Sequence, residues 1–203
     1  MRYGNYCACY RYGEFKKLNK DYWLEEMIRN ARDVCGEDAS DEQCRAWLNC
    51  REVLNRTLKD LPKAYKETVL VFEYLLPNHK PGTKKAETEK GIRPDVLMLS
   101  RDVVTVFEFK QRKADRDGTI FEGYAAQAKK YVKRLYKYHE ASKDMYVAPI
   151  LVMVLEKKLL EERDDITVCS PDRLADAICM LNGERPGALD DREVLAWLES
   201  PIS

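Results

Sequence analysis

The chain has 203 residues, of which 45% are hydrophobic, and this is enough for one full-sized domain with a buried core. Its 35 Lys and Arg residues balance 35 Asp and Glu residues, so a large net charge is excluded as the basis of nucleic-acid binding. Local basic patches could still bind a nucleic acid. All apolar runs are far shorter than the roughly 20 residues of a membrane-spanning helix, so no membrane association is expected.

Seven cysteines are scattered along the chain without a CxxC pair, which is typical of reduced thiols in a cytosolic protein. The first residues lack the apolar segment of a signal peptide, so we expect a cytoplasmic protein. The cysteine spacing fits neither a structural zinc site nor an iron–sulfur cluster. His79 and His139 are expected to be exposed to solvent.

The first part of the chain predicts two helices and a strand. Residues 1–18 are rich in Tyr and basic residues and predict no definite element. Apolar residues at helical spacing predict a helix over 20–34. Ser40 and Gln43 have the spacing of a capping box, which predicts that a second helix begins there. The β-branched and aromatic segment 68–77 predicts a strand that ends at a proline.

The middle of the chain predicts a loop, three strands and a long helix. The polar segment 79–91 is the loop, and strands are expected near 94–99 and 103–110. Apolar residues at steps of three and four predict a helix over about 120–140. The continuous apolar segment 148–156 predicts a central strand that is buried on both faces.

The remaining segment predicts one more strand and two helices. Residues 166–170 predict a short strand, and Ser170 is the expected cap of a helix that ends at Gly183. A short helix is expected near the C-terminus. The order α-α-β-β-β-α-β-β-α predicts an α/β fold, with a mixed central sheet flanked by helices.

Charged residues occur where two of the predicted strands are otherwise apolar. Asp95 heads the strand at 94–99, and Glu108 and Lys110 lie in the next strand. Side chains two residues apart in a strand share a face, so Glu108 and Lys110 point the same way and Asp95 can meet them. The alternative is an ordinary exposed salt bridge. The apolar flanks favour a site, because an unpaired charge among them is costly.

The residue types at this position suit a metal-dependent hydrolysis. Mg²⁺ prefers carboxylate and carbonyl oxygens together with several waters, and Mn²⁺ is the expected substitute. Asp95, Glu108 and the Phe109 carbonyl would hold the metal. Lys110 would orient the attacking water and counter the charge that develops on a phosphodiester.

Pro94-Asp95 followed by Glu108-x-Lys110 resembles the motif of the PD-(D/E)XK nuclease superfamily. Residues 40–156 are similar to the nuclease-like domain that lies N-terminal to the helicase part of DUF2075-type proteins. The resemblance implies a metal-dependent nuclease, with DNA as the expected substrate. It also implies a restriction-endonuclease-like α-β-β-β-α-β core.

The expected domain organisation follows from that resemblance. Residues 39–183 would form the nuclease-like domain, residues 1–38 a helical extension, and residues 184–203 a C-terminal helix packed on the same domain. The chain has no P-loop motif, so it carries no helicase motor.

Further site residues are expected from the same resemblance. Glu73 is a candidate metal ligand, and its alternative role is a structural pair with Arg93 or Lys110. Gln127 and Tyr131 resemble a QxxxY helix motif and share one helix face. Gln127 would bind the lysine or a phosphate. Tyr131 would pack beneath Gln127 or contact the nucleic acid, with a core residue as the alternative.

Basic residues near the motif are candidates for binding the nucleic-acid backbone, with a solvated surface as the alternative. They comprise Arg112, Lys113, Arg116, Lys130 and Lys133. The main functional alternative is an inactive nuclease-like fold that binds nucleic acid or regulates a defence or mobile-element system. A protein partner that supplies DNA recognition and a C₂ homodimer are further expectations.

Overall fold

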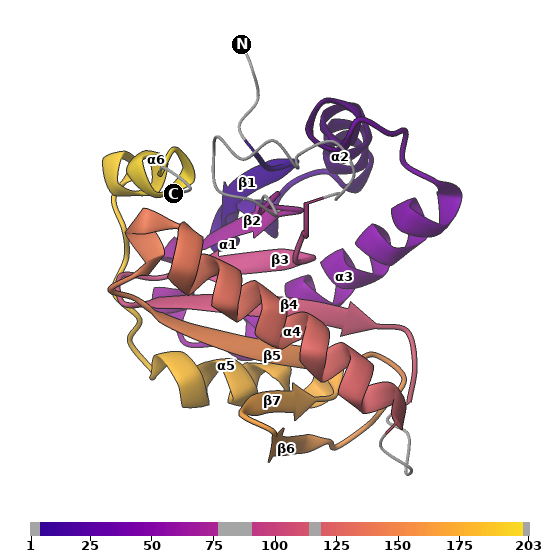
Figure 1. Ribbon diagram of the computed structural model, residues 1–203, viewed down its shortest axis with the longest axis vertical. Helices are drawn as coiled ribbons and strands as arrows, with labels where there is room; N and C mark the ends of the chain where they lie inside the picture. The colour runs from indigo at the N-terminus through magenta and orange to yellow at the C-terminus, as the bar shows by residue number, and fades with distance from the viewer. Residues whose placement is uncertain (1–4, 77–90, 114–118, 201–203) are drawn as a thin grey trace.

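The computed structural model describes residues 5–76, 91–113 and 119–200. Within these ranges the centre is a seven-stranded sheet in the order β1-β2-β3-β4-β5-β7-β6, with helices on both faces (Figure 1). The strands are β1 (Ala8–Arg11), β2 (Val69–Phe72), β3 (Val96–Leu99), β4 (Val103–Lys110), β5 (Tyr146–Met153), β6 (Leu160–Arg163) and β7 (Ile166–Cys169). The expected α/β class with a mixed sheet between helices is confirmed.

The described helices include six α-helices and three short 3₁₀ helices. The α-helices are α1 (Tyr12–Phe15), α2 (Lys20–Cys35), α3 (Asp41–Asp60), α4 (Thr119–Tyr138), α5 (Leu174–Asn182) and α6 (Asp191–Leu198). The 3₁₀ helices are η1 (Lys63–Glu67), η2 (Glu140–Ser142) and η3 (Pro171–Arg173). The described part of the chain contains no helix with the length and apolar character needed to cross a bilayer.

The sheet is antiparallel on one side and parallel in its centre. Strands β1 to β4 pair antiparallel in sequence, and α4 then leads to β5, which lies parallel to β4. β7 is also parallel to β5, and β6 pairs antiparallel with β7 at the far edge. Every residue of β5 except Tyr146 is buried, which confirms the expectation of a central strand.

Alternating side chains divide the core between the two faces of the sheet. On one face, Leu97 and Val106 pack in the same cluster as Tyr131 of α4. On the other face, Val96 and Phe107 belong to a cluster that includes residues of α2, α3 and α5. Figure 1 shows α4 lying across the front of β4 and β5. The C-terminal ends of β2 and β4 and the N-terminal end of β3 therefore lie between α4 on one face of the sheet and α3 on the other.

The helices begin and end at residues suited to those positions. The Asn19 side chain accepts hydrogen bonds from the first amides of α2, and Gly36 follows the helix with a φ of 71°. The Ser40 hydroxyl accepts from the Gln43 amide and caps α3 where the sequence predicts it. These local signals place α2 and α3 close to their predicted bounds.

Three predicted features at strand ends and helix ends are wrong. β2 ends at Phe72 instead of reaching residue 77, because Glu73 turns into the left-handed region with a φ of 52°. Ser170 does not cap the following helix, since its hydroxyl bonds to the backbone of Leu159. His139 is fully buried, where its ring contacts the Ser142 hydroxyl and a backbone carbonyl of α6.

Two strands arise from segments that predicted no strand. β1 lies within residues 1–18, and β6 lies in a charged segment before β7. β1 shares the sheet with the predicted nuclease-like region, and Trp23 of α2 shares its core cluster with Leu54 of α3. The domain bounds at residues 38 and 183 stay predictions.

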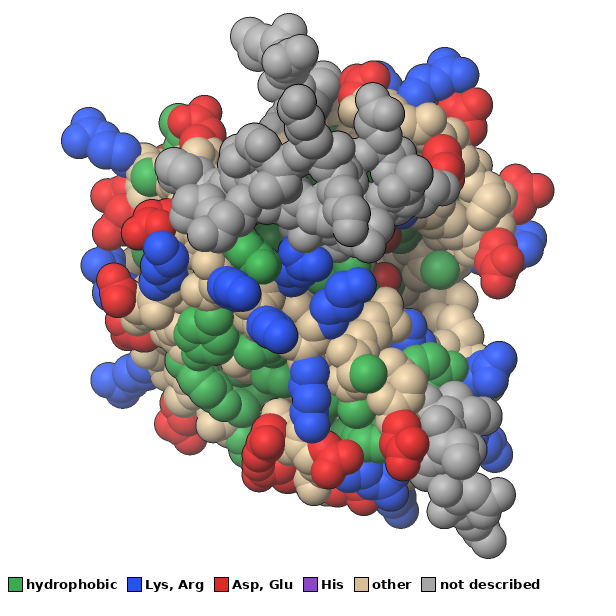
Figure 2. Space-filling view, in the orientation of Figure 1, with side chains coloured by type: hydrophobic (Ala, Val, Ile, Leu, Met, Phe, Trp, Pro, Cys, Tyr) green, Lys and Arg blue, Asp and Glu red, His purple; other side chains and the backbone are tan. Residues whose placement is uncertain are grey.

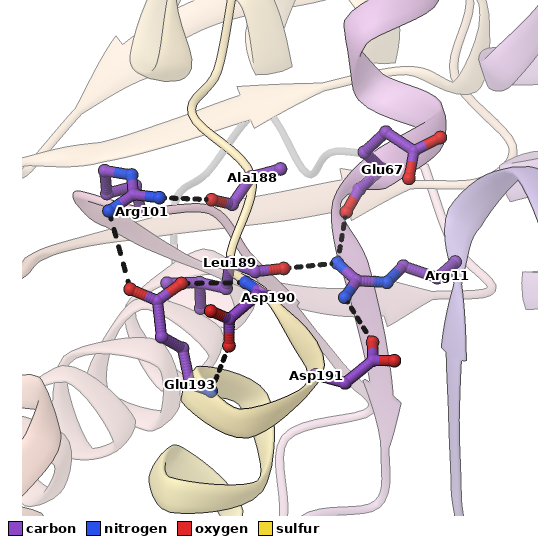
Figure 3. Close-up of polar contacts among 8 residues, drawn as sticks. All are labelled: Arg11, Glu67, Arg101, Ala188, Leu189, Asp190, Asp191 and Glu193. Atoms are coloured by element: carbon purple, nitrogen blue, oxygen red, sulfur yellow. Dashed lines mark hydrogen bonds and ion pairs between the residues drawn. The ribbon is translucent and has the colours of Figure 1, made fainter.

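Ion pairs and carbonyl contacts attach the segment before α6 to the sheet (Figure 3). We define the α6 corner as Arg11, Glu67, Arg101 and residues 188–193. The Arg11 guanidinium donates to the Leu189 carbonyl at 2.6 Å and to Asp191 at 2.6 Å. Arg101 donates to the Ala188 carbonyl at 2.9 Å. These contacts fix the entry of α6 beside β1.

Candidate active site

The motif residues lie together where β3 begins and β4 ends. The antiparallel register pairs Val96 with Phe107, which brings Asp95 beside the end of β4. One Asp95 carboxylate oxygen accepts a hydrogen bond from the Phe109 amide at 2.7 Å. This bond fixes the carboxylate against the strand that carries the other two motif residues.

Glu108 and Lys110 point to the same face, as the alternation of β4 requires. The Lys110 amine donates to Glu108 Oε1 at 2.6 Å. The side chain of Glu108 is only 4% exposed and that of Lys110 is 19% exposed. The pair is therefore not the exposed surface salt bridge that the sequence allowed as an alternative.

A hydrogen-bonded chain from α4 continues the pair. Lys110 also donates to the Gln127 side-chain oxygen at 3.1 Å. The Gln127 amide nitrogen donates to the Tyr131 hydroxyl at 2.6 Å, and that hydroxyl donates to the Arg93 carbonyl at 3.0 Å. Gln127 thus contacts the lysine as predicted. Tyr131 is buried in the core, and its hydroxyl also orients Gln127.

Glu73 is held by partners from two elements. Its Oε1 accepts from the Trp47 indole nitrogen at 2.8 Å, and its Oε2 lies 3.5 Å from the Arg93 guanidinium. Arg93 also donates to the Cys35 sulfur. Both carboxylate oxygens of Glu73 therefore have a protein partner. This geometry favours the structural pair with Arg93, and a metal-binding role of Glu73 stays a prediction.

Three carboxylates share this end of the sheet and perturb one another. Burial raises the pKa of Asp95 well above its ordinary value, and the nearby charges of Glu108 and Glu73 raise it further. Burial also raises the pKa of Glu108, although Lys110 opposes that shift. Burial also raises the pKa of Glu73. The hydrogen bond from Trp47 is the largest effect that opposes this rise. Keeping all three carboxylates ionised at this site is therefore costly without a further cation.

We define the strand-end cluster as Asp95, Glu108, Lys110, Gln127 and Tyr131. One atom of this cluster is unpaired, because Glu108 Oε2 is buried and has no hydrogen-bond partner among the described residues, and the nearby Tyr131 hydroxyl donates to the Arg93 carbonyl instead. Native proteins rarely leave such an atom unpaired without a reason. A cation beside this oxygen would compensate for both the charge and the missing partner.

The donor set contains only oxygen atoms, so it fits Mg²⁺ better than a metal that prefers nitrogen or sulfur ligands. In the described ranges, no three His, Cys, Asp or Glu side chains form a preassembled metal-binding group. Mg²⁺ needs only one or two carboxylates because it retains several waters. Asp95 and Glu108 meet that requirement, and the Phe109 carbonyl is on the same strand. Mn²⁺ accepts the same oxygen ligands.

A cavity of about 660 Å³ opens beside Asp95. It lies between α3 and α4 at the ends of the strands. Trp47 and Cys50 line it from α3, and Gln127 and Lys130 line it from α4. Trp47 is therefore a residue of the candidate site. The sequence patterns had assigned it only to the apolar side of a helix.

The basic candidates lie around this cavity and on α4. Lys130 lines the cavity, while Lys133 is exposed further along α4. Figure 2 shows a row of basic side chains across the face where α4 lies in Figure 1. Arg112 and Lys113 are exposed just after β4. Arg116, His79 and most of the predicted loop at 79–91 lie outside the described residues.

Comparisons of the chain with protein-family models, with curated proteins and with solved structures found no match. A function must therefore be inferred from the side chains of the strand-end cluster and from the cavity beside it.

Proposed function

We propose that the protein is a metal-dependent nuclease that hydrolyses phosphodiester bonds in DNA. The observation that carries this proposal is the position of Lys110. Its amine is held between Glu108 and Gln127, beside a second carboxylate and an unpaired carboxylate oxygen. A structural ion pair would need neither the second carboxylate nor the cavity.

The order of the elements supports a restriction-endonuclease-like core. α3 precedes three antiparallel strands β2, β3 and β4, and α4 then leads to the parallel strand β5. This is the α-β-β-β-α-β order that the sequence resemblance implies. The motif residues lie on the second and third strands of that unit, with the QxxxY residues on the helix that follows.

The chain's own residues would divide the work as follows. Asp95 and Glu108 would hold the metal, which supplies Lewis-acid chemistry that activates water and neutralises phosphate charge. Two of the three Lys110 N–H groups donate to Glu108 and Gln127. The ammonium also lies 4.7 Å from the centre of the Tyr124 ring, and its remaining N–H would orient a water molecule or a phosphate oxygen.

Gln127 and Tyr131 would act as positioning residues. Gln127 accepts from Lys110 while it donates to Tyr131, and Tyr131 is anchored on a backbone carbonyl. A lysine held from two sides loses little freedom when the substrate binds, so its charge is already directed at the reacting phosphate. The exposed lysines of α4 would attract the DNA backbone.

One observation favours the alternative of an inactive nuclease-like fold. Glu73 is occupied by Trp47 and Arg93, which leaves Asp95 and Glu108 as the two carboxylates of the described site that could hold a metal. An inactive protein would bind DNA or a divalent cation without cutting. The two functions therefore differ in turnover and can be separated by one assay.

The test is cleavage of supercoiled plasmid and of labelled oligonucleotides with Mg²⁺, with Mn²⁺ and with EDTA. We expect metal-dependent cleavage that falls at least ~100-fold in Lys110→Ala, since a positioned charge contributes on the order of 3 kcal/mol to such a transition state. Lys143→Ala is the matched control, because Lys143 is an exposed lysine that pairs with Glu140. We expect it to cut like the wild type.

Two outcomes would contradict this proposal. Intact plasmid, single-stranded DNA and RNA under every metal condition would refute the nuclease. If Mg²⁺ still raised the melting temperature, the inactive fold would replace it.

A further inference from the structure

The cavity beside Asp95 is lined by apolar side chains together with charged and polar ones. Three side chains from three different segments line it without bonding to any described residue: Gln43 of α3, Gln111 after β4 and Lys130 of α4. Trp47 and Phe72 line the interior. A mainly apolar cavity with a few convergent polar groups is the usual form of a ligand site.

The size of the cavity restricts what can enter it. Its volume of about 660 Å³ falls within the roughly 300–1,000 Å³ of small-ligand pockets. One nucleotide is a ligand of that class, whereas a stretch of double helix is far larger. A base in a duplex could enter only after leaving its stack, which costs free energy that a single-stranded base does not require.

The chemistry of the lining suits a nucleobase. The Trp47 indole is fixed by its hydrogen bond to Glu73 and is 5% exposed, so it contributes a small, preset aromatic contact to the cavity wall. Each glutamine amide both donates and accepts, which matches the mixed edge of a base. Lys130 at the mouth suits the phosphate backbone on either side of that base.

We propose that this cavity receives one unpaired nucleobase and that the substrate is therefore single-stranded DNA. The inference rests on the proposed nuclease function, because the phosphate next to the bound base would then lie at Asp95. Tracts of single-stranded DNA and free strand ends would be the substrates of choice. Continuous duplex would be cut poorly.

Binding can be measured without cleavage, because the tryptophans report on the cavity. The chain has three tryptophans, and both Trp23 and Trp47 line the cavity. Trp197 lies elsewhere, with its ring 5.2 Å from that of Tyr74. Its indole nitrogen has no partner among the described residues, so Trp197→Phe removes the background signal without breaking a side-chain hydrogen bond there.

The Trp197→Phe protein is titrated in EDTA with a short single-stranded oligodeoxynucleotide and with the same strand annealed to its complement. We expect the single strand to quench the fluorescence and to bind about ten-fold more tightly than the duplex, since stacking of one base contributes roughly 1–3 kcal/mol. Equal affinity for the two, or single-strand binding without quenching, would overturn the inference.

Two variants at the mouth test the position of the base. Gln43→Ala removes a free amide, and Ala46→Leu narrows the cavity from an exposed position on α3. Each is expected to weaken single-strand binding about five-fold. Asn49→Ala is the control, because Asn49 is an exposed amide on the same helix that lines a different pocket. Equal effects of Gln43→Ala and Asn49→Ala would contradict the proposal.

Cleavage of the same oligonucleotides with Mg²⁺ separates the two proposals. Quenching by single strands without any cleavage would refute the nuclease and leave the base-binding cavity in place. Cleavage of duplex at the same rate as single strands would leave the nuclease and refute the base-binding cavity. The expected result is cleavage of the single strand at least about ten-fold faster.

Discussion

The strand-end cluster and the α6 corner both bring together charged side chains from distant segments, yet they differ in burial and in balance. At the α6 corner, the Asp191 side chain is 98% exposed and pairs with Arg11. In the strand-end cluster, the Glu108 side chain is 4% exposed and one of its oxygens has no described partner. One set of charges is paired at the protein surface, and the other is buried with a carboxylate oxygen that has no described partner.

This difference indicates where function resides. Exposed ion pairs contribute little to stability, and they fix the position of a segment at small cost. Buried carboxylates that repel one another destabilise the fold, so their presence needs a compensating ligand or reaction. The comparison predicts that mutations at the strand-end cluster change activity and metal response, while mutations at the α6 corner change neither.

The largest expected effect is the loss of cleavage in Asp95→Asn. The amide keeps the acceptor for the Phe109 amide but loses the negative charge that would hold the metal. We expect the cleavage rate to fall at least ~100-fold, which corresponds to about 2.7 kcal/mol in the activation free energy. Initial rates with labelled DNA measure it. A rate within ten-fold of the wild type would remove Asp95 from the site.

The second effect is stabilisation by the metal. At a Mg²⁺ concentration of ten times its dissociation constant, the free energy of unfolding should rise by about 1.4 kcal/mol. For a chain of this size the melting temperature should rise by about 3–6 °C. Asp95→Ala should abolish the shift, whereas Asp191→Ala at the α6 corner should retain it. An equal shift in both variants would place the metal elsewhere.

The third effect is a pH dependence of stability in EDTA. Folding raises the pKa of Asp95, Glu108 and Glu73, so the folded state retains protons that the unfolded state has released. Their contribution to the free energy of unfolding therefore falls as the pH rises from about 4 through the folded pKa values. Melting curves between pH 5 and pH 8 should show a smaller decline in Asp95→Asn. Identical slopes would contradict the mutual repulsion.

The smallest expected effect is that of Asp191→Asn at the α6 corner. It removes one exposed ion pair and leaves the Arg11 bond to the Leu189 carbonyl. The melting temperature should change by less than about 2 °C. A larger loss would show that the α6 corner is more than a set of solvated pairs.

The sequence predicted the parts of the site that follow from local periodicity. The period of two in a strand places Glu108 and Lys110 on one face, and the helical period places Gln127 and Tyr131 together. The structure has both contacts. The same local signals located α2, α3 and β4 within one or two residues.

Contacts between distant segments could not be predicted in this way. The Trp47 bond to Glu73 joins residues 26 positions apart, and no local pattern marks it. His139 was expected to be exposed because it lies at the end of a predicted helix. It is buried because the backbone of α6, 58 positions later, covers it. β1 was missed for the same reason, since its pairing depends on β2 far along the chain.

The outer strand β6 has a consequence for how copies of the protein meet. Glu161 and Glu162 are exposed on β6 at the far edge of the sheet. An edge strand with free backbone groups can pair with another chain and start aggregation, and charged side chains oppose this. Two copies that paired through β6 would bring four acidic side chains close together. Continuous strand-to-strand growth through β6 is therefore disfavoured.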